Sequence, residues 1–260
     1  MFGYCSAKYD WPDHGVPNKF IVIASTYRSG SSFLSSLMWR TGCFGAPWEY
    51  FNYESVMEYM QIRLHAENFD DYLIKLMKCR TSASGVFSVK AHFHHFDNIV
   101  SKSRIGVGLA RKSKYLYIDR RDKIEQAVSL AKAIQTNAWI SLTTARQTPL
   151  FYNFDFICAC YEELQAQAME WQHWFETHEV TPFVVTYEEI VADPKVSLRK
   201  IAENFDIAFD ETAEVGVAVP KKQADALNDE WVDRFRRSAR ELSSTIAPND
   251  RARQSGGKLS

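Results

Sequence analysis

A short polar segment, Ser25–Ser32, has the residue types and spacing that suit the binding of an anion. It reads Ser-Thr-Tyr-Arg-Ser-Gly-Ser-Ser and holds one cation, Arg28, next to small residues and Gly30. An apolar run with β-branched members, Phe20–Ala24, precedes it and predicts a strand buried on both faces of a parallel sheet. Apolar residues at helical spacing follow it, up to Arg40. Because backbone N–H groups and the positive end of the helix dipole meet at such a junction, the segment suits a phosphate or sulfate group.

The same segment lacks the features of a nucleotide triphosphatase loop, whose pattern is G-x-x-x-x-G-K-[ST]. Ser25 stands at the first glycine, and Ser31 replaces the lysine that reaches the β- and γ-phosphates. Arg28 keeps its proton and can neutralise a terminal phosphate or sulfate without magnesium. An ordinary turn with solvent-facing polar residues explains this segment equally well when it is considered alone.

The rest of the chain predicts strands that alternate with helices. We expect strands at 85–90, 114–118 and 182–187, two helices within 55–80, a loop at 44–53, helices at 123–136 and 155–178, another helix that Pro194 begins, and an amphipathic helix within 223–240. This order predicts an α/β fold, with a parallel sheet and helices on both faces. Ligands of such sheets bind at the carboxyl ends of the strands.

Cations lie at that edge after three of the predicted strands. Arg28 follows the first strand, Lys90 ends the second, and Arg120 and Arg121 follow the third. Together they would suit a strongly anionic ligand. The plainer alternatives are a solvated charge cluster with Asp122 as a helix N-cap, and a lysine that only extends its ammonium group into solvent.

Length and composition limit the domain number, the partners and the location that we expect. The 260 residues fit a single α/β domain at 1–260, with a lead-in at 1–19 and a flexible tail at 247–260, and 46% hydrophobic residues supply its core. A net charge of −1 does not favour nucleic acid as a partner. The five cysteines include no C-x-x-C pair, and no apolar run approaches membrane-spanning length. With no secretory signal pattern either, we expect free thiols in a soluble, cytoplasmic protein.

Two separated stretches resemble one protein family. The first is Thr26–Leu34, followed by Arg-Thr-Gly at 40–42 and Pro-Trp-Glu-Tyr-Phe at 47–51, and the second lies within 223–236. Both are similar to bacterial carbohydrate sulfotransferases typified by trehalose 2-sulfotransferase, to which lipopolysaccharide and nodulation-factor sulfotransferases are related. The resemblance implies a P-loop-kinase-like fold, the donor 3′-phosphoadenosine 5′-phosphosulfate, a carbohydrate or glycolipid acceptor, and a homodimer. It requires no metal. The lack of a long apolar run predicts no transmembrane segment, and peripheral membrane contact stays open.

The resemblance also implies roles for single residues. Glu49 matches the carboxylate that acts as general base during in-line transfer, whereas a lone loop glutamate without this match is most often solvated. Its aromatic neighbours lead us to expect a raised pKa. Arg28 and Lys90 would stabilise the charge on the leaving adenosine 3′,5′-bisphosphate. Arg120 and Ser129 would hold the 3′-phosphate, with Arg121 as the competing arginine.

The remaining implied site residues form two sets. The donor set contains Thr26, Arg28, Ser29, Gly30, Ser31, Ser32, Arg120 and Ser129, and the acceptor set contains Tyr27, Pro47, Trp48, Tyr50, Phe51 and Asn52. Tyr27 and Asn52 both replace a glutamine of the trehalose enzymes, so trehalose itself is not assumed. Gln223 and Trp231 are expected near the donor or the acceptor, with their roles open.

Two alternative functions and one alternative site remain. A P-loop-type small-molecule kinase would share the sheet but should carry the missing lysine and an acid for magnesium. A non-catalytic nucleotide- or sugar-binding module would keep the loop and dispense with Glu49. A metal cluster of His92, His94, His95 and Asp97 lacks a second group of ligands in the sequence, so we interpret these residues as surface or acceptor-pocket residues.

Overall fold

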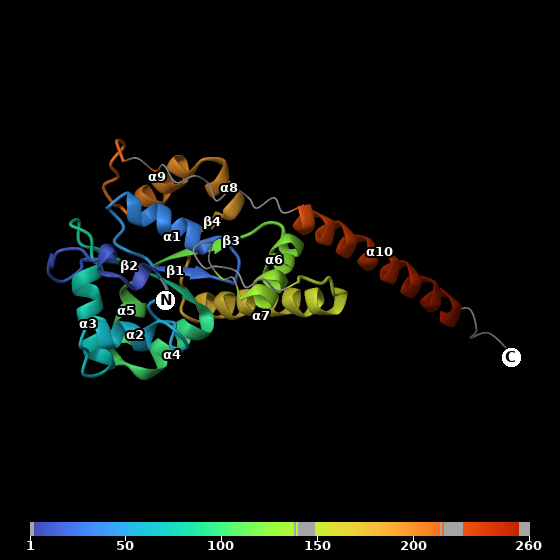
Figure 1. Cartoon of the computed structure of the whole chain (residues 1–260), viewed down its shortest axis with the longest axis horizontal. Helices are drawn as coiled ribbons and strands as arrows, with labels where there is room; N and C mark the ends of the chain where they lie inside the picture. The colour runs from blue at the N-terminus through green and yellow to red at the C-terminus, as the bar shows by residue number, and fades with distance from the viewer. Residues whose placement is uncertain (1–2, 138, 140–148, 214, 216–225, 255–260) are drawn as a thin grey trace. The chain divides into compact units, whose positions relative to one another are not determined.

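The computed structural model describes residues 3–137, 139, 149–213, 215 and 226–254 (Figure 1). Within these ranges the chain forms a parallel sheet of four strands in the order β2-β1-β3-β4. The strands are β1 (Lys19–Ser25), β2 (Val86–His92), β3 (Lys114–Asp119) and β4 (Phe183–Thr186). All four lie where the sequence predicts them, and the α/β class with a parallel sheet is confirmed.

The chain divides into two compact units, one of residues 1–121 and 164–220 and one of residues 122–163 and 221–260. The first unit contains the sheet, 3₁₀ helices at Gly3–Cys5 and Ala7–Tyr9, and helices α1 (Ser31–Arg40), α2 (Met57–Arg63), α3 (Phe69–Arg80), α4 (Phe93–Lys102), α5 (Arg104–Lys112), α8 (Tyr187–Ala192) and α9 (Pro194–Asn204). The second contains α6 (Lys123–Thr136) and α10 (Ala226–Gln254), and α7 (Phe154–Thr177) contributes to both.

Helices cover both faces of the sheet in the first unit, as predicted. On one face, Ile21 of β1 lies in a buried cluster with Leu34 of α1 and with residues of α8 and α9. On the other face, the ring of Tyr115 in β3 contacts Phe96 of α4, with centroids 6.1 Å apart, and Trp174 of α7, with centroids 4.9 Å apart. Figure 1 shows α1 and α9 on one side of the sheet and α4 and α5 on the opposite side.

Local signals fix several helix ends. Helix α1 ends at Arg40, and Gly42 follows with φ +74°, the left-handed conformation that glycine adopts without strain. Asp122 caps α6 by accepting a hydrogen bond from the Glu125 N–H at 2.9 Å. The predicted bounds of α6 are therefore confirmed, whereas α4, α5 and α8 are helices that the sequence analysis does not predict. Helix α10 continues to Gln254, into the segment that was expected to fray.

None of the described helices combines the length and the apolar character that crossing a bilayer requires.

Candidate active site

The loop between β1 and α1 has the backbone geometry of an anion site. Gly30 is the N-cap of α1 and has φ +87°, and Arg28 is also left-handed, with φ +58°. A Cβ at Gly30 would lie 2.3 Å from Cδ2 of Tyr187, so this position requires glycine for both its conformation and its contact. The first N–H groups of a helix have no partner within the helix. The loop therefore presents them at the carboxyl end of the central strand, where an anion is favoured.

Two arginines come together at this loop. Arg120 donates a hydrogen bond from Nη1 to the carbonyl oxygen of Arg28 at 3.2 Å, and its guanidinium lies 5.0 Å from the ring centroid of Tyr187. Burial, and then the charge of Arg120, lower the pKa of Arg28. An anion at the loop would relieve this repulsion between like charges.

The structure distinguishes the two neighbouring arginines after β3. The Arg121 side chain is 61% exposed and forms an ion pair with Glu189 at 3.1 Å. Arg120 is buried and contacts the loop. Of the two, Arg120 is thus the one that the fold places at the candidate anion site.

Other loop residues also face inward. Thr26, Ser29 and Ser31 are buried. The hydroxyl of Ser29 has no hydrogen-bond partner among the described residues. Because a buried hydroxyl without a partner costs free energy, this group suits a ligand that supplies an acceptor.

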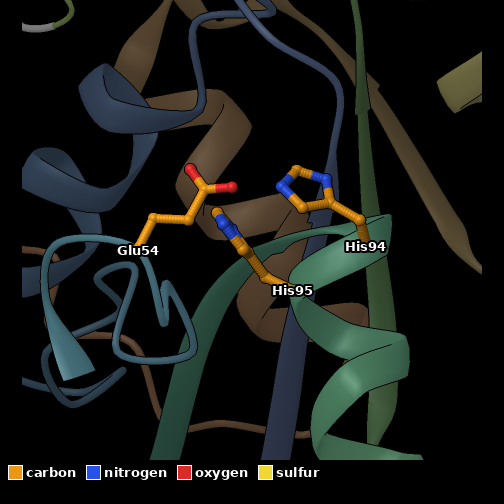
Figure 2. A group of neighbouring side chains, drawn as sticks. All are labelled: Glu54, His94 and His95. Carbon is orange, nitrogen blue, oxygen red and sulfur yellow. The ribbon is translucent and has the colours of Figure 1, made fainter. Parts of the chain in front are cut away.

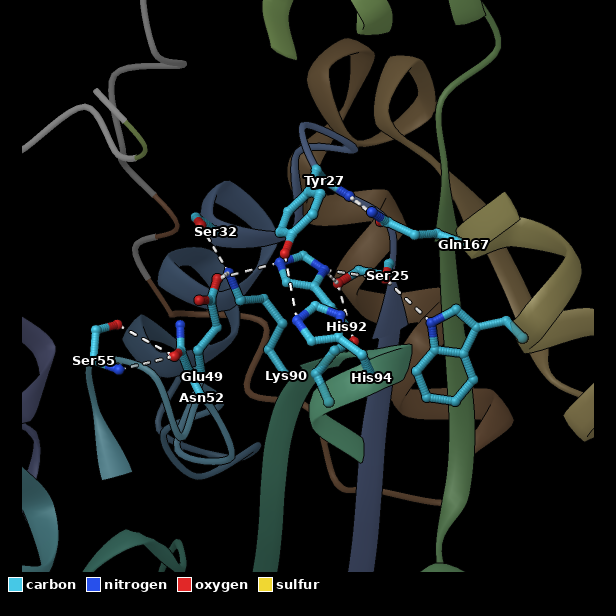
Figure 3. A network of polar contacts seen from close by, with 12 residues as sticks. Ser25, Tyr27, Ser32, Glu49, Asn52, Ser55, Lys90, His92, His94 and Gln167 are labelled. Carbon is cyan, nitrogen blue, oxygen red and sulfur yellow. Dashed lines mark hydrogen bonds and ion pairs between the residues drawn. The ribbon is translucent and has the colours of Figure 1, made fainter. Parts of the chain in front are cut away.

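Lys90 links the anion loop to Glu49 (Figure 3). Its Nζ forms an ion pair with Oε1 of Glu49 and donates a hydrogen bond to Oγ of Ser32 at 2.9 Å. The Lys90 side chain is only 2% exposed, which excludes the alternative of a lysine that extends into solvent. The N–H of Lys90 also donates to the carbonyl oxygen of Trp48 at 3.1 Å, which holds the segment carrying Glu49 against β2.

The expectation that the pKa of Glu49 is raised is wrong. Burial does raise it, but the Lys90 ammonium and a contact with His92 outweigh that effect, and the pKa lies well below its ordinary value. Nε2 of His92 lies 3.7 Å from Oε1 of Glu49. The aromatic neighbours of Glu49 in the sequence do not indicate these two partners, which come from β2.

Sequence reasoning missed Gln167, and it placed His92 among surface or acceptor-pocket residues and not next to Glu49. The predicted second strand stops at Lys90, but β2 continues to His92. Since side chains two apart in a strand share a face, a longer strand would have put Lys90 and His92 together. Gln167 of α7 accepts a hydrogen bond from the N–H of Tyr27 at 3.1 Å, and no local pattern indicates this contact.

The aromatic part of the acceptor set packs in the core. Trp48 stacks on Tyr4 with centroids 4.9 Å apart, and the Arg80 guanidinium lies 5.2 Å from the Tyr50 ring centroid. Phe51 is 1% exposed, and Pro47 is buried as well. The faces of these rings are occupied by protein, so the rings do not offer a stacking surface for a sugar in this structure.

Tyr27 and Asn52 are the partly exposed members of that set. The ring centroid of Tyr27 lies 4.4 Å from that of His92. Oδ1 of Asn52 accepts hydrogen bonds from the N–H groups of Glu54 and Ser55 at 3.1 and 3.2 Å, which fixes the turn after Glu49. Asn52 therefore lies in the turn that follows Glu49, and Tyr27 lies beside His92, the neighbour of Glu49.

The other three predicted residues do not lie in the described part of the first unit. Ser129 lies on α6 in the second unit, whereas Arg120 lies in the first, so their joint role at a 3′-phosphate stays a prediction. Trp231 is buried in the second unit with its ring edge against Tyr152, as the amphipathic pattern predicts. Gln223 lies outside the described residues.

The family model described as Stf0 sulphotransferase matches residues 72–238, and the chain belongs to this family. Trehalose 2-sulfotransferase of Mycolicibacterium smegmatis is 26% identical, over 87% of this chain and 97% of that protein. Its counterpart from Mycobacterium tuberculosis is 24% identical, over 85% and 96%. A solved sulfotransferase domain from the curacin biosynthetic pathway is 14% identical, with a TM-score of 0.47 and coverage of 79% and 83%.

The family match identifies the class of reaction as sulfuryl transfer. The anion loop and Glu49 lie before the matched residues. The roles that the resemblance implies for the loop residues and for Glu49 therefore stay predictions.

Proposed function

We propose that this protein transfers the sulfuryl group of 3′-phosphoadenosine 5′-phosphosulfate to a hydroxyl of a carbohydrate or glycolipid, with Glu49 as general base. The observation that carries the proposal is the position of Lys90 between Ser32 of the anion loop and Glu49. One buried ammonium thus contacts both the place suited to a leaving phosphate and the group suited to accept a proton.

In this mechanism the loop N–H groups and Arg28 bind the 5′-phosphosulfate, and Arg120 with Ser129 binds the 3′-phosphate. The acceptor oxygen forms a bond to sulfur while the bond from sulfur to the phosphate oxygen breaks. Glu49 takes the acceptor proton, and adenosine 3′,5′-bisphosphate leaves with its new charge stabilised by Arg28 and Lys90.

The low pKa of Glu49 gives Lys90 a second role. A carboxylate held by an ammonium is a weak base. When a donor fills the loop, its phosphate competes with Glu49 for Lys90, and the carboxylate becomes more basic. Donor binding would then prepare the base for proton transfer.

The acceptor lies next to Tyr27 and Asn52 in this proposal. The relatives named for trehalose support a small carbohydrate, and the burial of Trp48, Tyr50 and Phe51 means that other groups contact it. A homodimer, a cytoplasmic location and a single functional domain stay predictions. Light scattering that gives a monomer mass across micromolar concentrations would contradict the dimer.

Transfer of radiolabelled sulfate from the donor to a panel of free sugars and glycolipids tests the function. We expect labelled sugar and an equal amount of adenosine 3′,5′-bisphosphate, and calorimetry should give tighter binding of this bisphosphate than of ATP. Phosphorylated product from ATP and magnesium would favour the kinase alternative. Bisphosphate binding without transfer to any acceptor in the panel would favour the binding module.

A further inference from the structure

Three side chains outside the proposed transfer chemistry converge beside it (Figure 2). Glu54 lies in the turn before α2, and His94 and His95 lie in the first turn of α4. Each offers one ligand atom, and these atoms all lie within 4.8 Å of one another. In the sequence these two histidines stand with His92 and Asp97, and no second group of ligands predicts a metal there. Glu54, which the fold brings close, comes from a distant segment.

His95 provides an independent sign that a ligand belongs here. Its side chain is 2% exposed, and neither ring nitrogen has a hydrogen-bond partner among the described residues. A buried polar atom without a partner is unfavourable, so such an imidazole calls for a ligand atom. The neutral imidazole of histidine is a common ligand of metal ions.

Neighbouring groups orient the three side chains. Oδ1 of Asn52 accepts the Glu54 N–H at 3.1 Å and so fixes the turn that carries this carboxylate. The hydroxyl of Tyr27 lies 3.4 Å from Nε2 of His94. The Tyr53 ring meets the His95 ring edge-on, at 88° and 5.3 Å between centroids. Outer contacts of this kind hold ligands in place at metal sites.

We propose that Glu54, His94 and His95 bind a divalent transition-metal ion of the zinc class. Two imidazoles and one carboxylate form a donor set that zinc takes in tetrahedral sites, with the fourth position open to water or another ligand. Magnesium and calcium prefer oxygen ligands, so they should bind here weakly. The ion would tie the turn after Glu49 to the start of α4. This site needs neither the sulfuryl donor nor proton transfer, and it is independent of the proposed function.

The distances allow such a site after small side-chain rotations. Bonds of about 2.0–2.2 Å to a tetrahedral zinc ion place the donor atoms roughly 3.4 Å apart. In the structure the three donor atoms lie within 4.8 Å of one another, so they must move closer to bind one ion. Glu54 is exposed and can rotate toward the two rings.

Zinc binding to the chelator-treated, metal-free protein tests the proposal, with a chromophoric zinc chelator as competitor. We expect one zinc per chain, no displacement by excess magnesium, and a higher melting temperature with zinc. Loss of an outer contact at a metal site weakens binding by roughly 10–100-fold, and Asn52→Ala should weaken zinc binding by about 10-fold. Glu54→Gln and His94→Ala each remove a ligand, so each should weaken zinc binding by more than this range. Glu58→Gln on α2 and His173→Ala on α7 are exposed matched controls and should bind zinc like the wild type.

Zinc affinity that is equal in the wild type and in folded Glu54→Gln and His94→Ala variants would overturn the proposal. Equal losses in the two control variants would overturn it as well. Substitution with cobalt gives a second readout, because a tetrahedral cobalt site absorbs visible light strongly. The wild type should show these bands and Glu54→Gln should not.

Discussion

The two halves of the candidate active site distribute charge in opposite ways. The anion loop brings the like charges of Arg28 and Arg120 together next to the N-terminus of α1. The base network instead pairs opposite charges: the Glu49 carboxylate contacts the Lys90 ammonium and lies beside the His92 ring. Like charges gain most when an anion binds, whereas an opposite-charge pair is already satisfied within the protein. Substitutions in the loop should therefore change ligand affinity, and substitutions in the network should change stability and proton transfer.

The largest effect is expected for Lys90→Met, which breaks the buried ion pair. It leaves the Glu49 carboxylate without its ammonium partner, and removing one member of such a pair costs about 3–5 kcal/mol of unfolding free energy. Urea denaturation measures this loss. The double variant Lys90→Met/Glu49→Gln should recover most of it, since no uncompensated charge remains. A loss below about 1 kcal/mol in the single variant would show that solvent screens the pair.

In the loop, Arg28→Ala and Arg120→Ala should weaken the binding of adenosine 3′,5′-bisphosphate. A hydrogen bond to a charged group contributes about 1.5–3 kcal/mol, which corresponds to roughly 10–150-fold in affinity. Arg121→Ala is the matched control, because that side chain is exposed and paired with Glu189. Calorimetry should give wild-type affinity for this control. Equal losses at Arg120 and Arg121 would contradict the placement of the donor.

A smaller effect concerns acid stability. Because the pKa of Glu49 is lowered in the folded protein, its contribution to stability is complete above the ordinary pKa and is lost as the pH falls through the lower, folded-state value. The stability difference between the wild type and Glu49→Gln should be constant near neutral pH and should shrink below about pH 4.3. Thermal unfolding at a series of acidic pH values measures it. A difference that grows toward low pH would mean that the pKa of Glu49 is raised.

The smallest expected effect distinguishes the free protein from the donor complex. The acidic limb of kcat/KM reports the free enzyme, and that of kcat reports the enzyme with bound substrates. If a donor draws Lys90 away from Glu49, the apparent acidic pKa should be higher in kcat than in kcat/KM. Initial rates over a range of pH at saturating and limiting donor give both profiles, and identical limbs would exclude this coupling.

The two halves also differ in how far the sequence predicts them. The anion loop depends on neighbours in the chain: an apolar strand, glycine at a left-handed position and a helix start, each with a local signal. Helix α8 has such a signal as well, because the capping box of Thr186 and Glu189 marks its start in the sequence. The sequence does not decide which of Arg120 and Arg121 lies at the loop. The fold does, because Arg120 contacts Arg28 and Arg121 is exposed.

The base network depends on segments that are distant in sequence. The ionisation of Glu49 is set by Lys90 and His92 of β2, and its aromatic neighbours are taken up by contacts with Tyr4 and Arg80. No pattern near residue 49 indicates these partners. The residue types could therefore suggest a base, whereas its pKa and the packing of the rings required the fold.

The most direct test of the central claim compares turnover and donor-product affinity in Glu49→Gln. This change keeps the size of the side chain but removes its ability to accept a proton. We predict that kcat falls by roughly 10²-fold or more, while the affinity for adenosine 3′,5′-bisphosphate stays near or above that of the wild type, because no charged carboxylate then competes for Lys90. Glu58→Gln, an exposed change on α2, should keep wild-type turnover. Wild-type turnover in a folded Glu49→Gln protein would contradict the assignment of Glu49 as the base.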